Sequence, residues 1–171
     1  DICKCEPLLA VIESLDVINV PRTVPPLPNE LEIVSPSDKA PAFIPAKAKN
    51  MIRDCKLIAE KDNVKFKFNS YFPIKSLNLM RGVFVAEEDN CQNYYIESIF
   101  NAIWQDGLNM NEETVVHKVL KNLNINPKTF VLRLNSSFIK DSLRKKTTDA
   151  YERGIFGAPT FVANSKIFWG Q

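Results

Sequence analysis

Histidine is nearly absent from this chain of 171 residues, in which His117 is the only one. One histidine cannot supply a metal site with several histidine ligands, and it argues against a histidine-dependent catalytic triad. The four cysteines stand at positions 3, 5, 55 and 91, so no pair has the two-residue spacing of a zinc knuckle or a Cys-x-x-Cys redox motif. We therefore expect no metal site and no disulfide framework.

Long apolar runs are missing as well, and neither sign of charge dominates. No stretch reaches the roughly 20 apolar residues of a membrane-spanning helix, and no charged-then-apolar leader is visible. The formal net charge is +2, with both signs interleaved along the chain, which argues against a nucleic-acid partner. We expect neither membrane nor nucleic-acid binding, and one compact domain or one domain with an insertion.

The middle of the chain has the apolar spacing of helices, with residues three and four apart on one stripe. Leu77 and Tyr94 are predicted to belong to such buried stripes, and Cys55 is predicted to pack rather than to react. Pro73 suits the first position of a helix. Helices are predicted over 45–62, from Pro73 to about 84, over 90–106 and 112–123, from Asn126-Pro127 to 134, and from Ser136 or Ser137 to Gly154.

The two ends of the chain are typical of strands. Runs 159–163 and 166–169 flank Asn164-Ser165, which predicts a tight hairpin. Residues 17–28 predict a strand that enters a proline-rich loop. Pro159 suits the start of a strand, and a cis bond before it would hold out the backbone of Ala158 to pair with an extended peptide. The sequence therefore predicts an α/β protein with a helical middle.

Four segments resemble one known family. They are Gly154–Phe161 with Phe168–Gln171, Ala40–Lys47, Phe72–Leu77 with Met80-Arg81, and Phe100–Trp104 with Gly107. Together they look like 2-hydroxychromene-2-carboxylate isomerases and kappa-class glutathione transferases. The resemblance implies a DsbA-like thioredoxin fold with a large all-helical domain inserted in the middle. Residues 1–46 and 154–171 would form the thioredoxin-like domain, and 47–153 would form the insertion.

The resemblance also implies a glutathione site. In this family the cysteinyl amide of glutathione pairs with the residue before the cis-proline, which here is Ala158 before Pro159. Lys47 matches the lysine that approaches the glycyl carboxylate of glutathione. Asp38 stands where the family has an asparagine. The backbone that would flank the γ-glutamyl end belongs to Trp169, Gly170 and Gln171.

The catalytic and substrate positions are also implied by the resemblance, with departures. The serine that donates to the glutathione sulfur aligns with Lys4, beside Cys5. A lysine would stabilise a thiolate by its charge rather than through a hydroxyl. Ile74 and Lys75 match the substrate side, where Lys75 would face a substrate carboxylate or would simply be an exposed lysine.

The implied function is a glutathione-dependent isomerisation of a small aromatic acid, in which the bound thiolate adds to a conjugated double bond. Two other classes stay open. One is a kappa-like transferase in which the same thiolate attacks an electrophile. The other is a thiol–disulfide protein that uses Cys3 and Cys5, or a non-catalytic thioredoxin-like module. The resemblance further implies a homodimer in the cytoplasm, or in mitochondria or peroxisomes if the source is eukaryotic.

Overall fold

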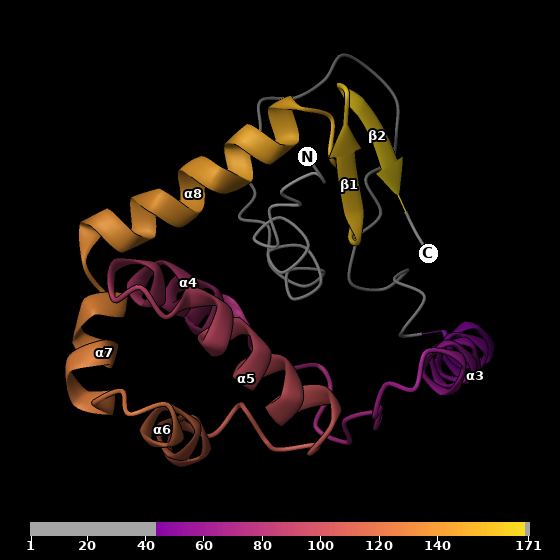
Figure 1. Cartoon of the computed structure of the whole chain (residues 1–171), viewed down its shortest axis with the longest axis horizontal. Coiled ribbons are helices and arrows are strands. Elements are labelled where there is room, and N and C mark those ends of the chain that lie inside the picture. The colour runs from indigo at the N-terminus through magenta and orange to yellow at the C-terminus, as the bar shows by residue number, and fades with distance from the viewer. Residues whose placement is uncertain (1–43, 170–171) are drawn as a thin grey trace.

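In the computed structural model, residues 44–169 are described, and they form six helices and one two-stranded sheet (Figure 1). Figure 1 shows α4 to α8 grouped together, α8 reaching from that group to the hairpin, and the indigo helix α3 lying apart. The helices are α3 (Pro45–Lys61), α4 (Leu77–Glu88), α5 (Gln92–Trp104), α6 (Glu113–Asn122), α7 (Pro127–Leu134) and α8 (Ser137–Glu152), and the strands are β1 (Thr160–Ala163) and β2 (Lys166–Trp169).

Helix α4 is the centre of the hydrophobic core. It packs against α5, α7 and α8, while α6 packs against α5 and α7. Met80 and Val85 of α4 and Leu120 of α6 are completely inaccessible to solvent. Burial of such side chains is the main force that holds these helices together, at about 1.5–3 kcal/mol for each large aliphatic residue.

Two helix starts follow the sequence prediction. Asn126 lies before α7, and its Oδ1 accepts hydrogen bonds from the N–H groups of Lys128 (3.0 Å) and Thr129 (3.4 Å). Ser136 caps α8, because its Oγ accepts a hydrogen bond from the N–H of Ile139 (3.3 Å). Such side-chain caps satisfy N–H groups that the first helical turn leaves without intrahelical partners.

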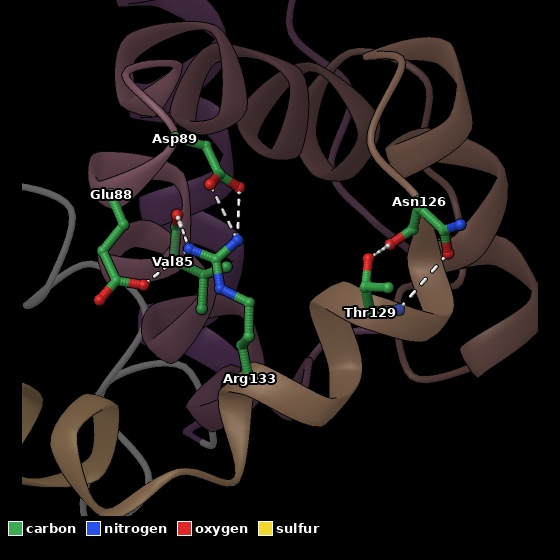
Figure 2. Close-up of polar contacts among 6 residues, drawn as sticks. All are labelled: Val85, Glu88, Asp89, Asn126, Thr129 and Arg133. Carbon is green, nitrogen blue, oxygen red and sulfur yellow. Dashed lines mark hydrogen bonds and ion pairs between the residues drawn. The ribbon is translucent and has the colours of Figure 1, made fainter.

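An arginine ties α7 to the end of α4 (Figure 2). Arg133 donates from one guanidinium nitrogen to both carboxylate oxygens of Asp89, at 2.8 and 2.7 Å. Its other terminal nitrogen donates to Glu88 Oε2 (2.6 Å) and to the backbone carbonyl of Val85 (3.3 Å). The positive charge therefore offsets two carboxylates at a helix C-terminus, where negative charge is unfavourable.

Three sequence predictions in the helical part are wrong. Helix α4 begins at Leu77 and not at Pro73. The residues before it form a turn in which the N–H of Lys75 donates to Asn111 Oδ1 (2.8 Å). Leu77 is 44% exposed and Tyr94 is 70% exposed, although both fit the periodic stripe. Periodicity marks one helix face but does not say how far the neighbouring helices extend over it.

The link from α3 to α4 crosses the end of α5. Four half-buried aromatic rings meet there, and Phe66 stacks on Trp104 with ring centroids 6.1 Å apart. Asn69 is completely buried, and its amide donates to the carbonyls of Ile103 and Leu108, both at 2.9 Å. Phe68 and Phe72 complete the aromatic cluster around Trp104.

The C-terminal hairpin confirms the sequence prediction. Strands β1 and β2 pair antiparallel, with Thr160 opposite Trp169. The two turn residues, Asn164 and Ser165, have φ values of 50° and 60°. Two consecutive positive φ values are the requirement of a tight hairpin turn whose twist matches the strands.

Candidate functional site

The loop before β1 contains Ala158 and Pro159, and the peptide bond between them is cis. Ala158 is half-buried and Pro159 is exposed. Within residues 44–169, neither the N–H nor the C=O of Ala158 takes part in a backbone–backbone hydrogen bond. This backbone group therefore has hydrogen-bonding capacity that the described part of the chain does not use.

Two side chains contact the peptide that leads into Ala158, and a third packs against one of them. The hydroxyl of Thr160 donates a hydrogen bond to the carbonyl of Gly157. A Cβ placed on Gly157 would lie only 2.7 Å from Nε1 of Trp169, so the indole rests directly on the glycine backbone. The ring of Phe156 contacts the indole at a centroid distance of 5.4 Å. Only glycine at position 157 allows the indole of Trp169 to come this close to the backbone.

Lys47 lies in the first turn of α3 and is exposed. A surface hollow of about 440 Å³ runs along this face of the helix. Asp54 is in the same hollow, where Asn50 donates to its carboxylate (2.9 Å) and Arg53 forms an ion pair with it (3.2 Å). Among the described residues, those that line the hollow are Ala46, Lys47, Asn50, Met51 and Asp54.

The two predicted substrate residues differ in exposure. Ile74 is 7% exposed and belongs to the hydrophobic core. Lys75 is exposed, and its backbone is fixed by the hydrogen bond to Asn111. Asn111 also donates to the carbonyl of Tyr71 (3.4 Å), so one asparagine spans both sides of this turn. The backbone of Lys75 is therefore fixed by this turn, while its side chain is exposed to solvent.

Several predicted residues lie outside the described part of the chain. They include both candidate catalytic residues, and their roles stay predictions, as do the domain boundaries, the homodimer and the compartment. The residues concerned are Cys3, Lys4, Cys5, Asp38, Gly170 and Gln171.

The two cysteines within residues 44–169 are poor nucleophiles. Burial, followed by the nearby charge of Asp54, raises the pKa of the Cys55 thiol. Burial, followed by the charge of Asp89, raises the pKa of the Cys91 thiol. Because the thiolate is the reactive form, both thiols are disfavoured as attacking groups near neutral pH. Cys55 is only half-buried, and no other residue of α3 is fully buried either.

The described residues contain neither a cluster of metal ligands nor a membrane-spanning helix. Between positions 44 and 169, no three or more histidine, cysteine, aspartate or glutamate side chains gather in a way that could hold a metal ion. In the same range, no helix combines the length and apolar character needed to cross a bilayer.

The sequence pattern identified Ala158 and Pro159 but missed the side chains that support them. The signal for Gly157 was present, because a glycine directly before a small residue and a proline often marks a close approach of the backbone. Nothing in the sequence indicated that Thr160 would bond back to Gly157, or that the side chain of Trp169 would cover it.

Comparisons with known proteins agree on one family. The family model described as "DSBA-like thioredoxin domain" matches residues 22–171. Over 125 residues the chain is 24% identical to a 2-hydroxychromene-2-carboxylate isomerase of Sphingobium xenophagum, covering 73% of this chain and 63% of that protein. Over 77 residues it is 29% identical to the enzyme of the same name from Pseudomonas putida, covering 45% and 38%. The chain thus spans less than two thirds of these relatives.

A solved structure of selenomethionine 2-hydroxychromene-2-carboxylate isomerase has the same fold. Its TM-score is 0.69 at 21% sequence identity, and the match covers 77% of this chain and 64% of that one. This likeness supports the fold alone, while the sequence matches establish distant homology to the isomerases. The match over residues 22–171 shows that the chain belongs to the family of DSBA-like thioredoxin domains.

Proposed function

We propose that this protein is a glutathione-dependent isomerase of the 2-hydroxychromene-2-carboxylate type. The observation that carries the proposal is the sequence match to curated isomerases, which extends over 125 residues in one of them. Fold alone would not support a reaction, because one fold serves many functions. The residues of the described part supply three groups that suit such a reaction.

The first group is the backbone of Ala158. Its N–H and C=O form no backbone–backbone hydrogen bond within residues 44–169, and an extended tripeptide can pair with both groups as an added strand. In this proposal Ala158 holds the middle residue of glutathione. When bound, glutathione supplies a thiolate nucleophile for a conjugated double bond.

The second group is the ammonium of Lys47. It is exposed at the start of α3, on the rim of the hollow along that helix. A helix N-terminus attracts anions, and a lysine there adds a charge-assisted hydrogen bond. The carboxylate of Asp54 in the same hollow is already engaged by Arg53 and Asn50. Lys47 is therefore the residue we assign to a carboxylate of the tripeptide.

The third group is Lys75, which we assign to the carboxylate of an aromatic acid substrate. Its side chain is exposed, while its backbone N–H is held by Asn111. An anchored backbone limits the positions that the ammonium can take, which favours binding in a single orientation. In a Lys75→Met variant, the carboxylate of the substrate would lose the ion pair that we assign to Lys75.

An assay of the purified protein tests the proposal. Isomerisation of 2-hydroxychromene-2-carboxylate should be measured with reduced glutathione, with S-methylglutathione and without either. We expect turnover only with reduced glutathione, because the methylated sulfur cannot ionise. Binding of glutathione without turnover would reduce the protein to a binding module, and turnover that ignores glutathione would contradict the proposal.

A lysine substitution tests the carboxylate contact separately. Lys47→Ala should weaken reduced glutathione binding about fivefold to tenfold, which corresponds to about 1–1.4 kcal/mol for an exposed charged contact. Isothermal titration calorimetry measures this change. Lys49→Ala is the matched control, because Lys49 is also an exposed lysine of α3. Equal affinities for wild type and Lys47→Ala would remove Lys47 from the site.

A further inference from the structure

We propose that Thr160 and Trp169 are positioning residues that fix the direction of the Ala158 N–H for its ligand. The inference rests on the proposed function, since it assumes that a peptide-like ligand pairs with Ala158. Neither side chain needs to touch that ligand. Both act on Gly157, the residue whose carbonyl shares a peptide unit with the Ala158 N–H.

The planar peptide bond connects the two groups. The carbonyl of Gly157 and the N–H of Ala158 belong to one peptide unit, and in a trans unit they point in opposite directions. The Thr160 hydroxyl donates to the Gly157 carbonyl. By holding that carbonyl toward β1, Thr160 directs the Ala158 N–H to the other side of the loop.

Burial makes the Thr160 hydrogen bond persistent. Thr160 is 6% exposed, although its neighbour Phe161 is 49% exposed. A buried hydroxyl that loses its partner is costly, because water cannot replace the bond. The bond also reaches back three residues, so it closes a ring that contains Ala158 and Pro159. Rotation of the Gly157–Ala158 peptide unit would have to break it.

Trp169 supports the same peptide unit from across the hairpin. Thr160 and Trp169 are directly opposite in the antiparallel register, so their side chains lie on one face of the hairpin. The indole Nε1 would lie 2.7 Å from a Cβ on Gly157, and Phe156 contacts the same indole. The indole therefore occupies the space into which this peptide unit would otherwise turn.

The effect on binding depends on the fraction of molecules in which the loop before β1 has the orientation that binds the ligand. If the loop adopts the binding orientation only part of the time, the apparent Kd rises in inverse proportion to that fraction. Loss of the Thr160 hydroxyl should therefore weaken binding of glutathione while leaving the ligand contacts themselves in place. At saturating glutathione the bound loop is restored, so kcat should change little while the KM for glutathione rises.

Three threonine variants test the inference by calorimetry with reduced glutathione and by steady-state kinetics. Thr160→Val should raise Kd and KM for glutathione roughly tenfold, and Thr160→Ser should stay within about threefold of wild type because it keeps the hydroxyl. Thr129→Val is the matched control, since Thr129 Oγ1 also donates to the carbonyl three residues back, on Asn126 (3.1 Å; Figure 2). The control should bind as wild type does.

A second pair of variants covers the case in which Thr160→Val does not fold. Trp169 is 59% exposed, so Trp169→Ala removes little buried surface and should raise Kd about threefold to tenfold. Trp104→Ala, in the aromatic cluster at the end of α5, should leave Kd unchanged.

The outcomes separate the inference from the proposed function. Wild-type affinity in Thr160→Val would overturn the positioning role of Thr160, and wild-type affinity in Trp169→Ala would overturn that of Trp169, while glutathione binding stands in either case. Failure of the wild-type protein itself to bind glutathione would overturn the proposed function and, with it, this inference.

Discussion

At the scale of single residues, Tyr95 of α5 restricts position 82 of the neighbouring helix α4 to glycine. It is 1% exposed, and its hydroxyl donates to the carbonyl of Leu79 in α4 (3.0 Å). Burial raises the pKa of the Tyr95 phenol well above its usual value, so it remains a neutral donor. A Cβ on Gly82 would lie 2.1 Å from this hydroxyl, and only the absent side chain makes the contact possible.

Gly82→Ala should therefore destabilise the protein despite the better helix propensity of alanine. The expected loss is about 1–3 kcal/mol, the usual cost of overpacking a core. Urea denaturation measures it. Tyr95→Phe alone should cost about 1 kcal/mol for the lost hydrogen bond. The double variant should lose less than the sum of both, and strict additivity would argue against the steric explanation.

Arg133 is a second residue whose effect can be isolated. Arg133→Gln should lower the free energy of unfolding by about 1–2 kcal/mol, because two carboxylates and the Val85 carbonyl lose a charged donor. Arg144→Gln is the control. Its pair with Asp141 (2.7 Å) is far more exposed, and we expect about 0.5 kcal/mol or less. Equal effects in urea denaturation would contradict a special role for Arg133.

At the scale of elements, the link between α3 and α4 depends on one buried amide. Asn69 donates to two carbonyls and accepts from the N–H of Tyr71 (2.8 Å). Asn69→Ala would leave one buried and two partly buried backbone groups without this partner, and we expect a loss of about 2–3 kcal/mol. Thermal unfolding with Asn135→Ala as control tests this, since the exposed Asn135 makes one long bond (3.4 Å). A small, equal effect would contradict the role of Asn69.

The sequence predicted elements best where local chemistry decides. Asn126 before Pro127 and Ser136 before α8 are caps that need no distant partner, and both starts are confirmed. The hairpin turn at 164–165 is local in the same way. The helix start predicted at Pro73 was wrong, and the turn there is bonded to Asn111, which is far along the chain.

The candidate site was predictable only in part, for a related reason. Ala158 and Pro159 were identified from a contiguous motif and from resemblance to a family. The contacts of Thr160 and Trp169 with Gly157 depend on strand register and on a ring that crosses the hairpin. Sequence spacing carries no record of such distances. The same limit applies to Leu77 and Tyr94, whose exposure depends on neighbouring helices.

At the scale of the whole molecule, stability should be unevenly distributed. Helix α4 contains completely buried residues such as Met80 and Val85, whereas no residue of α3 is buried. Amide hydrogen exchange followed by mass spectrometry should find α4 on the order of a hundredfold slower than α3, because buried helices open only with global unfolding. Equal protection of the two helices would contradict this distribution.

The separation of the two tryptophans has a practical consequence. Trp104 lies among the rings at the end of α5, and Trp169 lies beside the loop that contains Ala158. Replacing Trp104 with phenylalanine would leave Trp169, next to the proposed ligand, as the single tryptophan. Its fluorescence spectrum would then follow events at the hairpin without an added dye, and Trp169→Phe would provide the complementary signal from the helices.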